Sequence, residues 1–225
     1  CSSDLIVRAL RTASLPAPVR RVEVRPDRWP AILDGLTIAV ISDLHIAPGT
    51  APGYVRDIVE RTNALAPDVV ALCGDLVDGS VDTLADAVQP LGDLRARLGT
   101  FAVTGNHEFF SGALPWVAFL RKIGIDGLEN DRRTLSVGDT AFDVAGVPDF
   151  MAGRFGSDGA PKLADTLAGR DKTRPVILLA HQPRQFDEAA ALGVTLQLSG
   201  HTHGGQIWPF TLLVRLVDRR VAGVY

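Results

Sequence analysis

Six short apolar runs recur along this chain, and segments with helical periodicity lie between them. Their length and their content of Val and Ile are typical of strands, several of them buried on both faces. Strands that alternate with helices predict an α/β fold. The runs are "LTIAVIS" (36–42), "DVVALCG" (68–74), "TFAVTG" (100–105), "TAFDVAGV" (140–147), "PVILLAH" (175–181) and "VTLQLSG" (194–200), and the amphipathic segments are 54–65, 82–98, 114–123, 160–168 and 184–191.

Two local features refine this α/β pattern. Pro90 lies inside the segment 82–98 and predicts a break or kink in that helix. The stretch 126–150 has two strand-like pieces around "VGDT", which predicts a hairpin and therefore a partly antiparallel sheet. We expect residues 1–35 to form an N-terminal extension or edge segment and residues 36–225 to form one domain.

Charge and hydropathy exclude some classes of partner. The net charge of -3 and the isoelectric point near 5.9 give no basic footprint for nucleic acid. For Arg20 and Arg21 we favour a solvated face or edge strand over a membrane-surface patch. No apolar run reaches the roughly 18 to 20 residues of a spanning helix. The chain begins at Cys1 rather than methionine, so an upstream signal peptide or membrane helix, and with it membrane association, stays open. Compartment and oligomeric state stay open too.

Five of the apolar runs end in a polar cluster. These clusters contain all five histidines of the chain. In open α/β sheets, sites form beyond the carboxyl ends of strands, so clusters far apart in sequence can converge there. The clusters are Asp43-Leu44-His45, Gly74-Asp75, Gly105-Asn106-His107-Glu108, His181 and Gly200-His201-Thr202-His203.

The residue types in these clusters indicate a metal site. In Asp-x-His and His-x-His, residues i and i+2 share one face of an extended backbone, so both can reach one ion. Imidazole, carboxylate and amide ligands suit Zn, Mn, Fe or Co rather than Ca. Seven ligands are too many for one open tetrahedral site, whereas two ions about 3.5–4 Å apart that share Asp75 use them all. The candidate ligands are Asp43, His45, Asp75, Asn106, His181, His201 and His203.

The ordered motifs "DLH", "GDLVD", "GNHE", a lone His and "GHTH" resemble the calcineurin-like metallophosphoesterases over roughly residues 36–210. Phrases such as "ILLAHQP" and "LSGHTHGGQIWP" look closest to a bacterial subgroup of membrane-linked or exported phosphodiesterases related to UDP-2,3-diacylglucosamine hydrolases. This resemblance implies a two-sheet β-sandwich with helices on both outer faces, four layers in all. It also implies that residues 36–225 are the catalytic domain and that the last C-terminal strands are missing.

The resemblance implies a role for each motif residue. Two divalent ions (Mn, Zn or Fe) would serve the hydrolysis of phosphate esters, most of all phosphodiesters, by a hydroxide that bridges the ions. The substrate would be a small phosphate ester or a lipid-linked phosphodiester. Asp43, His45 and His203 would hold the first ion, Asn106, His181 and His201 the second, Asp75 would bridge them, and His107 would assist the leaving group.

Several alternatives remain beside this interpretation. A catalytically weak or non-catalytic metal-binding scaffold of the same fold is the main one. A zinc peptidase is disfavoured because no His-Glu-x-x-His occurs, and a serine hydrolase because no Gly-x-Ser-x-Gly occurs. Asp78 and Glu108 could either orient histidines or be plainly solvent-exposed. Phe109, Phe110 and Trp116 could line an apolar pocket, although ordinary packing is the commoner reason for such spacing.

Overall fold

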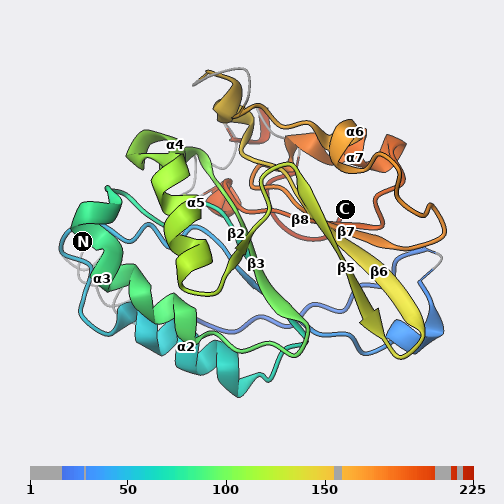
Figure 1. Ribbon diagram of the computed structural model, residues 1–225, viewed down its shortest axis with the longest axis horizontal. Helices are drawn as coiled ribbons and strands as arrows, with labels where there is room; N and C mark the ends of the chain where they lie inside the picture. Colours follow the sequence, from blue (N-terminus) through green and yellow to red (C-terminus); the bar gives the residue numbers. More distant parts are fainter. Residues whose placement is uncertain (1–16, 28, 155–158, 206–213, 217–219) are drawn as a thin grey trace, which may run out of the picture.

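Two four-stranded sheets form the centre of the protein (Figure 1). The structure is a computed structural model that describes residues 17–27, 29–154, 159–205, 214–216 and 220–225. The first sheet is parallel, in the order β1 (Ile38–Ile41), β2 (Val69–Cys73), β3 (Gly99–Val103) and β4 (Asp126–Gly127). The second has the order β5 (Asp131–Val137), β6 (Thr140–Gly146), β7 (Val176–Leu179) and β8 (Leu196–Leu198). Only β5 and β6 are antiparallel within these two sheets as described.

Helices connect most of the strands. The longer ones are α2 (Tyr54–Ala64), α3 (Val81–Val88) and α5 (Ala113–Lys122). Short helices are α4 (Asn106–Ser111), α6 (Leu163–Thr166) and α7 (Phe186–Ala191). Single 3₁₀ turns are η1 (Ala31–Leu33), η2 (Gln89–Asp93), η3 (Phe150–Arg154), η5 (Pro183–Gln185) and η6 (His203–Gly205).

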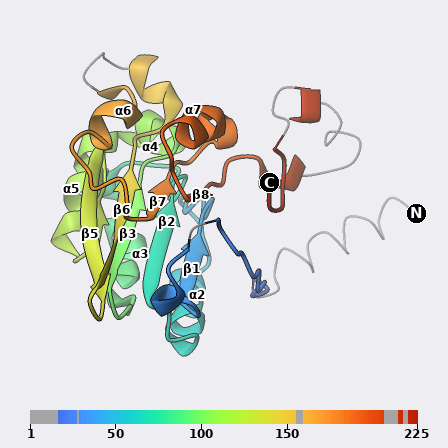
Figure 2. The ribbon, with the colours of Figure 1, turned by 90° about the vertical axis from the view of Figure 1, so that its right-hand side faces the viewer.

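Three apolar layers hold these elements together. All of β2 is buried, because Val70 and Leu72 pack under α2, α3 and α5 while Ala71 and Cys73 face the second sheet. Phe142 and other residues of β6 and β7 fill the space between the sheets. The outer face of the second sheet packs against α6 and α7. The expected four-layer arrangement of helices, two sheets and helices is therefore confirmed (Figures 1 and 2).

The local expectations are mostly confirmed. The β5–β6 hairpin turns at "VGDT", where Gly138 has a φ of 55°. The chain leaves the α-helical form at Val88, and Pro90 lies in the following 3₁₀ turn, so the helix expected over 82–98 is shorter. The helix expected over 160–168 covers only Leu163–Thr166. The pattern missed α4, because its six residues lie between two glycines and begin with the polar "NHE".

The N-terminal segment has mixed character. Residues 17–27 form neither helix nor strand, and Arg20 and Arg21 are exposed, as expected for a solvated face. Leu33 of η1, by contrast, is buried in the layer between the sheets. Residues 1–16 and 206–213 lie outside the described part of the chain, so the expected lack of the last C-terminal strands is not tested. Among the described residues, no helix combines the length and apolar character of a membrane span.

Candidate metal centre

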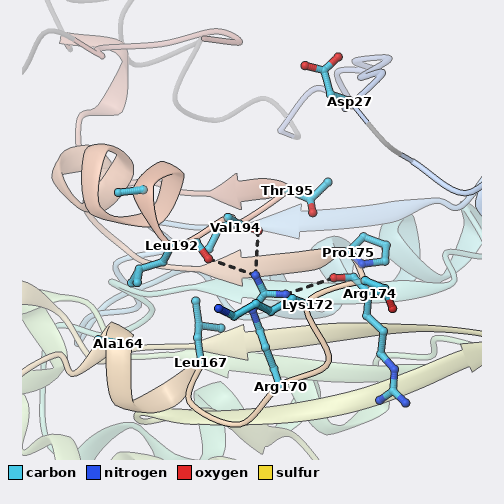
Figure 3. A pocket seen from close by; sticks show the side chains of 13 residues that line it. Asp27, Ala164, Leu167, Arg170, Lys172, Arg174, Pro175, Leu192, Val194 and Thr195 are labelled. Atoms are coloured by element: carbon cyan, nitrogen blue, oxygen red, sulfur yellow. Dashed lines mark hydrogen bonds between the residues drawn. The ribbon is translucent and has the colours of Figure 1, made fainter.

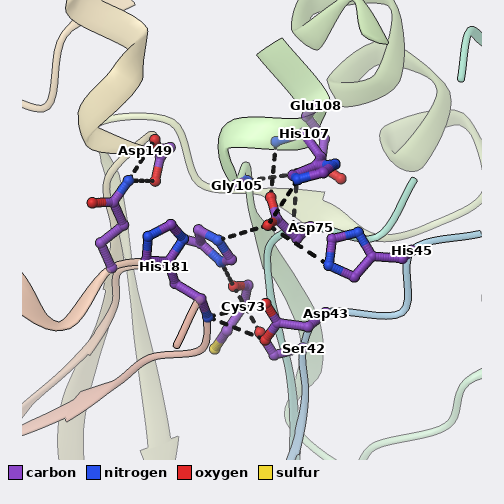
Figure 4. Close-up of polar contacts among 12 residues, drawn as sticks. Ser42, Asp43, His45, Cys73, Asp75, Gly105, His107, Glu108, Asp149 and His181 are labelled. Carbon is purple, nitrogen blue, oxygen red and sulfur yellow. Dashed lines mark hydrogen bonds and ion pairs between the residues drawn. The ribbon is translucent and has the colours of Figure 1, made fainter. Parts of the chain in front are cut away.

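The polar clusters converge at one end of the sheets, as the strand directions predict. Asp43 and His45 follow β1, Asp75 follows β2, His107 follows β3 and His181 follows β7, and their side chains point toward one another (Figure 4). Backbone hydrogen bonds tie the loops together, since the Asp43 and His45 amides donate to the carbonyls of Gly74 and Asp75 at 3.0 Å. The site is therefore assembled from segments of both sheets.

One group of ligand atoms comprises Asp43, His45 and His203, which lie within 4.8 Å of one another. The Nε2 atoms of His45 and His203 are 3.2 Å apart, and His203 Nε2 is 3.3 Å from Asp43 Oδ1. Two ligands bonded to one tetrahedral ion at about 2.0–2.1 Å stand roughly 3.3 Å apart. The spacing of these three residues, which were predicted to hold the first ion, fits a common ion.

A second group comprises Asp75, His181 and His201, also within 4.8 Å. Asp75 Oδ2 lies 3.1 Å from His181 Nε2 and 4.0 Å from His45 Nε2, so its carboxylate stands between the two groups. Asn106 Oδ1 is buried and has no hydrogen-bond partner among the described residues, whereas the buried His181 Nε2 faces the Asp75 carboxylate. Buried polar atoms are rarely left unpaired, so Asn106 Oδ1 in particular fits the role of a metal ligand.

Burial and charge set the protonation of this second group. Burial alone raises the pKa of Asp75, but the adjacent His181 ring outweighs it and the net pKa is lowered. Burial alone would lower the pKa of His181, yet the Asp75 carboxylate raises it to about 9. The His181 Nδ1 faces the Cys73 carbonyl at 2.7 Å, which leaves Nε2 toward Asp75. An ion that binds here displaces a proton, so its affinity rises with pH.

The backbone of the site differs from the extended form that the Asp-x-His pattern suggested. Asp43, His45, Asp75, His201 and His203 all have positive φ, between 45° and 71°. The expectation that these pairs share one face of an extended strand is therefore wrong. Left-handed backbone costs a non-glycine residue roughly 1–2 kcal/mol and is concentrated at functional sites. Sharp turns, rather than strand alternation, bring the side chains together.

Glycines let these turns pack closely. A Cβ on Gly105 would overlap the backbone nitrogen and carboxylate of Asp75, and one on Gly200 would overlap Ser42 and the Asp43 carboxylate. Neither glycine needs a positive φ, so the close approach of the chain is the reason for the residue type.

Asp78 fixes two histidines. Its Oδ1 lies 2.6 Å from His107 Nδ1 and 3.1 Å from His45 Nδ1, and these three residues form a further group within 4.8 Å. Because Nδ1 of both rings is engaged, Nε2 of both is directed toward Asp75, at 3.9 Å from His107 and 4.0 Å from His45. Of the two interpretations of Asp78, orientation of histidines is the one that its contacts support.

Comparison with known proteins identifies the family of this arrangement. Residues 36–205 match the family of calcineurin-like phosphoesterases. The chain belongs to the calcineurin-like phosphoesterase family. It is 35% identical over 228 residues to a zebrafish (Danio rerio) transmembrane protein with metallophosphoesterase domain, covering 98% of this chain and 52% of that protein.

Further relatives and structures agree with this family. An uncharacterized metallophosphoesterase of Helicobacter pylori is 38% identical over 191 residues, which cover 84% of this chain and 50% of that protein. The chain thus spans about half the length of these curated relatives. The fold matches a putative 5'-nucleotidase of Staphylococcus aureus with a TM-score of 0.53 and 17% identity, over 74% of this chain and 45% of that one.

Glu108 is the residue of this phosphoesterase whose role the sequence left most open. It is 2% exposed, which excludes the solvent-exposed alternative. Its carboxylate accepts hydrogen bonds from the backbone amides of Asp75 (2.9 Å), Leu76 (2.6 Å), Val77 (3.2 Å) and Gly105 (2.6 Å). Glu at the third position of a helix reaching back to the N-cap amide is half of a capping box, a signal that "GNHE" carried. Glu108 therefore fixes the loop that presents Asp75.

Glu108→Gln is expected to destabilise the protein by about 2–4 kcal/mol. The side-chain nitrogen of glutamine cannot accept a hydrogen bond, so some of the buried backbone N–H groups that donate to Glu108 are left unpaired. The change is measured as a shift of the urea midpoint. Glu188→Gln on the exposed face of α7 is the matched control and is expected to change stability by less than about 0.5 kcal/mol. A Glu108→Gln midpoint equal to that of the control would contradict this role.

The aromatic side chains near the site divide into two kinds. Trp116 is 1% exposed, packs in the core under the first sheet and donates from Nε1 to the Gly79 carbonyl. It therefore lines no substrate pocket. Phe110 is 61% exposed and meets the His107 ring edge to face, with centroids 5.7 Å apart.

A surface hollow of about 660 Å³ lies at the opposite end of the second sheet (Figure 3). Pro175 and Thr195, which line it, precede β7 and β8, whereas the metal ligands follow these strands. The Arg170 guanidinium in its wall donates to the carbonyls of Leu192 and Gly193 and so holds the chain itself. The hollow is separate from the candidate metal centre.

Proposed function

We propose that this phosphoesterase hydrolyses phosphodiesters with two divalent ions, of Mn, Zn or Fe. The observation that carries the proposal is the convergence of two ligand groups on either side of the Asp75 carboxylate. The buried, unpaired Asn106 Oδ1 supports it, because an ion would satisfy this atom. In the proposal, Asp43, His45 and His203 hold one ion, Asn106, His181 and His201 the other, and Asp75 contacts both.

Neighbouring groups hold the candidate ligands in position before an ion binds. When bound, two such ions neutralise charge on phosphoryl oxygens and acidify a water molecule. The Cys73 carbonyl and the Asp78 carboxylate fix the rings of His181 and His45. Burial, and after it the nearby Asp43 carboxylate, raise the pKa of the Cys73 thiol to about 12, so Cys73 stays a protonated thiol in the layer between the sheets.

His107 is proposed as the group that protonates or hydrogen-bonds the leaving oxygen. Its side chain is 37% exposed, so a substrate can reach it, and Asp78 holds its Nδ1. Nε2 is directed toward the ligand groups, at 3.9 Å from Asp75 Oδ2, and is placed to donate a proton to a leaving oxygen bound there. General acid catalysis of this kind contributes typically about 10²–10⁴-fold.

The proposal extends to the whole protein's setting. The zebrafish relative is named as transmembrane, and the "LSGHTHGGQIWP" segment resembles membrane-linked phosphodiesterases. We propose that residues 36–225 are the catalytic domain of a membrane-linked phosphodiesterase and that lipid-linked phosphodiesters are among its substrates. Measuring the turnover of phosphomonoesters, nucleotide diphosphates and lipid-linked phosphodiesters would show which of these substrate classes the protein prefers.

The first test uses a chromogenic diester. The Mn-loaded protein is expected to hydrolyse bis-p-nitrophenyl phosphate with a higher kcat/KM than p-nitrophenyl phosphate, and chelation of the metal is expected to abolish both activities. Binding of Mn without turnover of either compound would contradict the proposal and favour the metal-binding scaffold.

A further inference from the structure

Arg184 and Phe150 form a pair on the loops that follow β7 and β6. The Arg184 guanidinium carbon lies 4.3 Å from the centre of the Phe150 ring. Arg184 is exposed, and Phe150 is 48% exposed although it is a large apolar residue. Stacking on an aromatic face holds a guanidinium in place while leaving its N–H groups available.

Both members of the pair leave the sheet where the metal ligands do. Phe150 follows β6 and Arg184 follows β7, and these neighbouring parallel strands pair Gly146 with Leu179 at their ends. Arg184 stands three residues after His181, and three residues span at most about 11 Å. Arg184 thus lies on the same loop as the candidate ligand His181, at the end of the sheets where the ligand groups gather.

A buried polar link fixes the two loops relative to each other. Gln182 Nε2 donates to both carboxylate oxygens of Asp149, at 3.0 and 2.8 Å, and the Met151 amide donates to the same carboxylate at 2.7 Å. Asp149 and Gln182 are both buried (Figure 4 shows Asp149 beside His181). The Arg184–Phe150 pair is therefore positioned in advance of any ligand.

The positive charge of Arg184 is not neutralised by an ion pair within the described part of the protein. Across residues 17–27, 29–154, 159–205, 214–216 and 220–225, no carboxylate forms an ion pair with it. A guanidinium presents a planar fork of donors that matches phosphate and carboxylate groups. An arginine held beside an acidic site, with its fork open, is suited to an anionic part of a ligand.

We propose that Arg184, supported by Phe150, binds a second anionic group of the substrate, a phosphate or a carboxylate, apart from the phosphate that reacts. This inference rests on the proposed phosphodiesterase function and narrows its substrate class. Such an interaction is made equally in the ground state and in the transition state, so it lowers KM more than it raises kcat.

The test compares three p-nitrophenyl esters of thymidine 5'-phosphate that carry a free hydroxyl, a phosphate or a hemisuccinate at the 3' position. The reacting diester is the same in all three. The wild type is expected to show a kcat/KM at least about 10-fold higher for one or both anionic compounds, mainly through KM. A preference confined to the 3'-phosphate or to the hemisuccinate distinguishes the two anion sources.

Variants assign the preference to the pair. Arg184→Ala is expected to remove the preference, because uniform binding of the remote anionic group is lost. The kcat/KM of the variant for the 3'-hydroxyl compound is expected to stay within about 2-fold of the wild-type value. Arg184→Lys and Phe150→Leu are expected to retain part of the preference. Arg174→Ala is the matched control, because Arg174 pairs with Asp171 at the opposite end of the second sheet and its loss changes the net charge equally.

The outcomes separate the two proposals. Absence of any preference in the wild type, or its persistence in Arg184→Ala, would overturn the role of Arg184. If the wild type hydrolysed none of the three compounds, the result would instead contradict the phosphodiesterase function. In that case the role of Arg184 is tested by calorimetry. The wild type is expected to bind thymidine 3',5'-bisphosphate more tightly than thymidine 5'-phosphate, and Arg184→Ala is expected to bind the two compounds equally. Equal binding of the two compounds by the wild type would overturn the role of Arg184.

Discussion

Asp75→Asn is expected to empty both ion positions together and to lower kcat/KM by about 10³-fold or more, because both electrostatic centres of the reaction are lost. Asp75 Oδ2 lies 3.1 Å from His181 Nε2 and 4.0 Å from His45 Nε2, so its carboxylate stands between the two ligand groups. In the wild type, Asp75 Oδ1 accepts a hydrogen bond from the His107 backbone amide at 2.8 Å. The side-chain oxygen of asparagine can still accept this hydrogen bond. Metal content by mass spectrometry and turnover of a chromogenic diester measure the effect.

The matched control for this substitution is Asp165→Asn on α6, an exposed residue remote from the ligand groups. It makes the same chemical change and is expected to leave metal content and turnover unaltered. Thermal unfolding of both variants separates loss of metal from loss of fold. An Asp75→Asn protein that keeps one ion at full occupancy and loses only the other would show that Asp75 is not shared.

His107→Ala is expected to keep both ions and to lower kcat by about 10²–10⁴-fold, the range of general acid catalysis. His107 lies outside both predicted ligand sets, and its Nδ1 is held by Asp78 at 2.6 Å. The loss should depend on the leaving group. An alkoxide needs a proton as it departs, whereas p-nitrophenolate is stable without one, so an alkyl diester should suffer much more than a p-nitrophenyl diester.

The leaving-group comparison separates catalysis from mere support of the site. If His107 only stabilised the loop, both diesters would lose activity by the same factor. Equal losses, or metal contents below those of the wild type, would therefore contradict the assignment of His107 as a proton donor.

The sequence predicted those parts of the molecule that depend on local pattern and strand direction. A continuous apolar run such as "DVVALCG" is enough to place a buried strand, and parallel strands must bring their carboxyl ends to one edge. Hence Asp75, Asn106 and His181 could be expected to meet although many residues separate them. The hairpin at Gly138 and the break near Pro90 follow equally from local turn chemistry.

Other features could not be predicted because they depend on contacts between distant segments. Nothing in the periodicity shows that Asp43 and His45 adopt left-handed backbone, since their neighbours in sequence do not impose it. Glu108 accepts hydrogen bonds from amides more than thirty residues away, a contact that the local sequence "GNHE" does not show. The Arg184–Phe150 pair joins two loops that share no sequence motif.

Anomalous diffraction from crystals of the Mn-loaded protein tests the metal centre most directly. We expect two peaks about 3.5–4 Å apart, with the Asp75 carboxylate between them. Asp43, His45 and His203 should surround one peak, and Asn106, His181 and His201 the other. A single peak, or peaks bound away from these side chains, would contradict the two-ion site on which the proposed function depends.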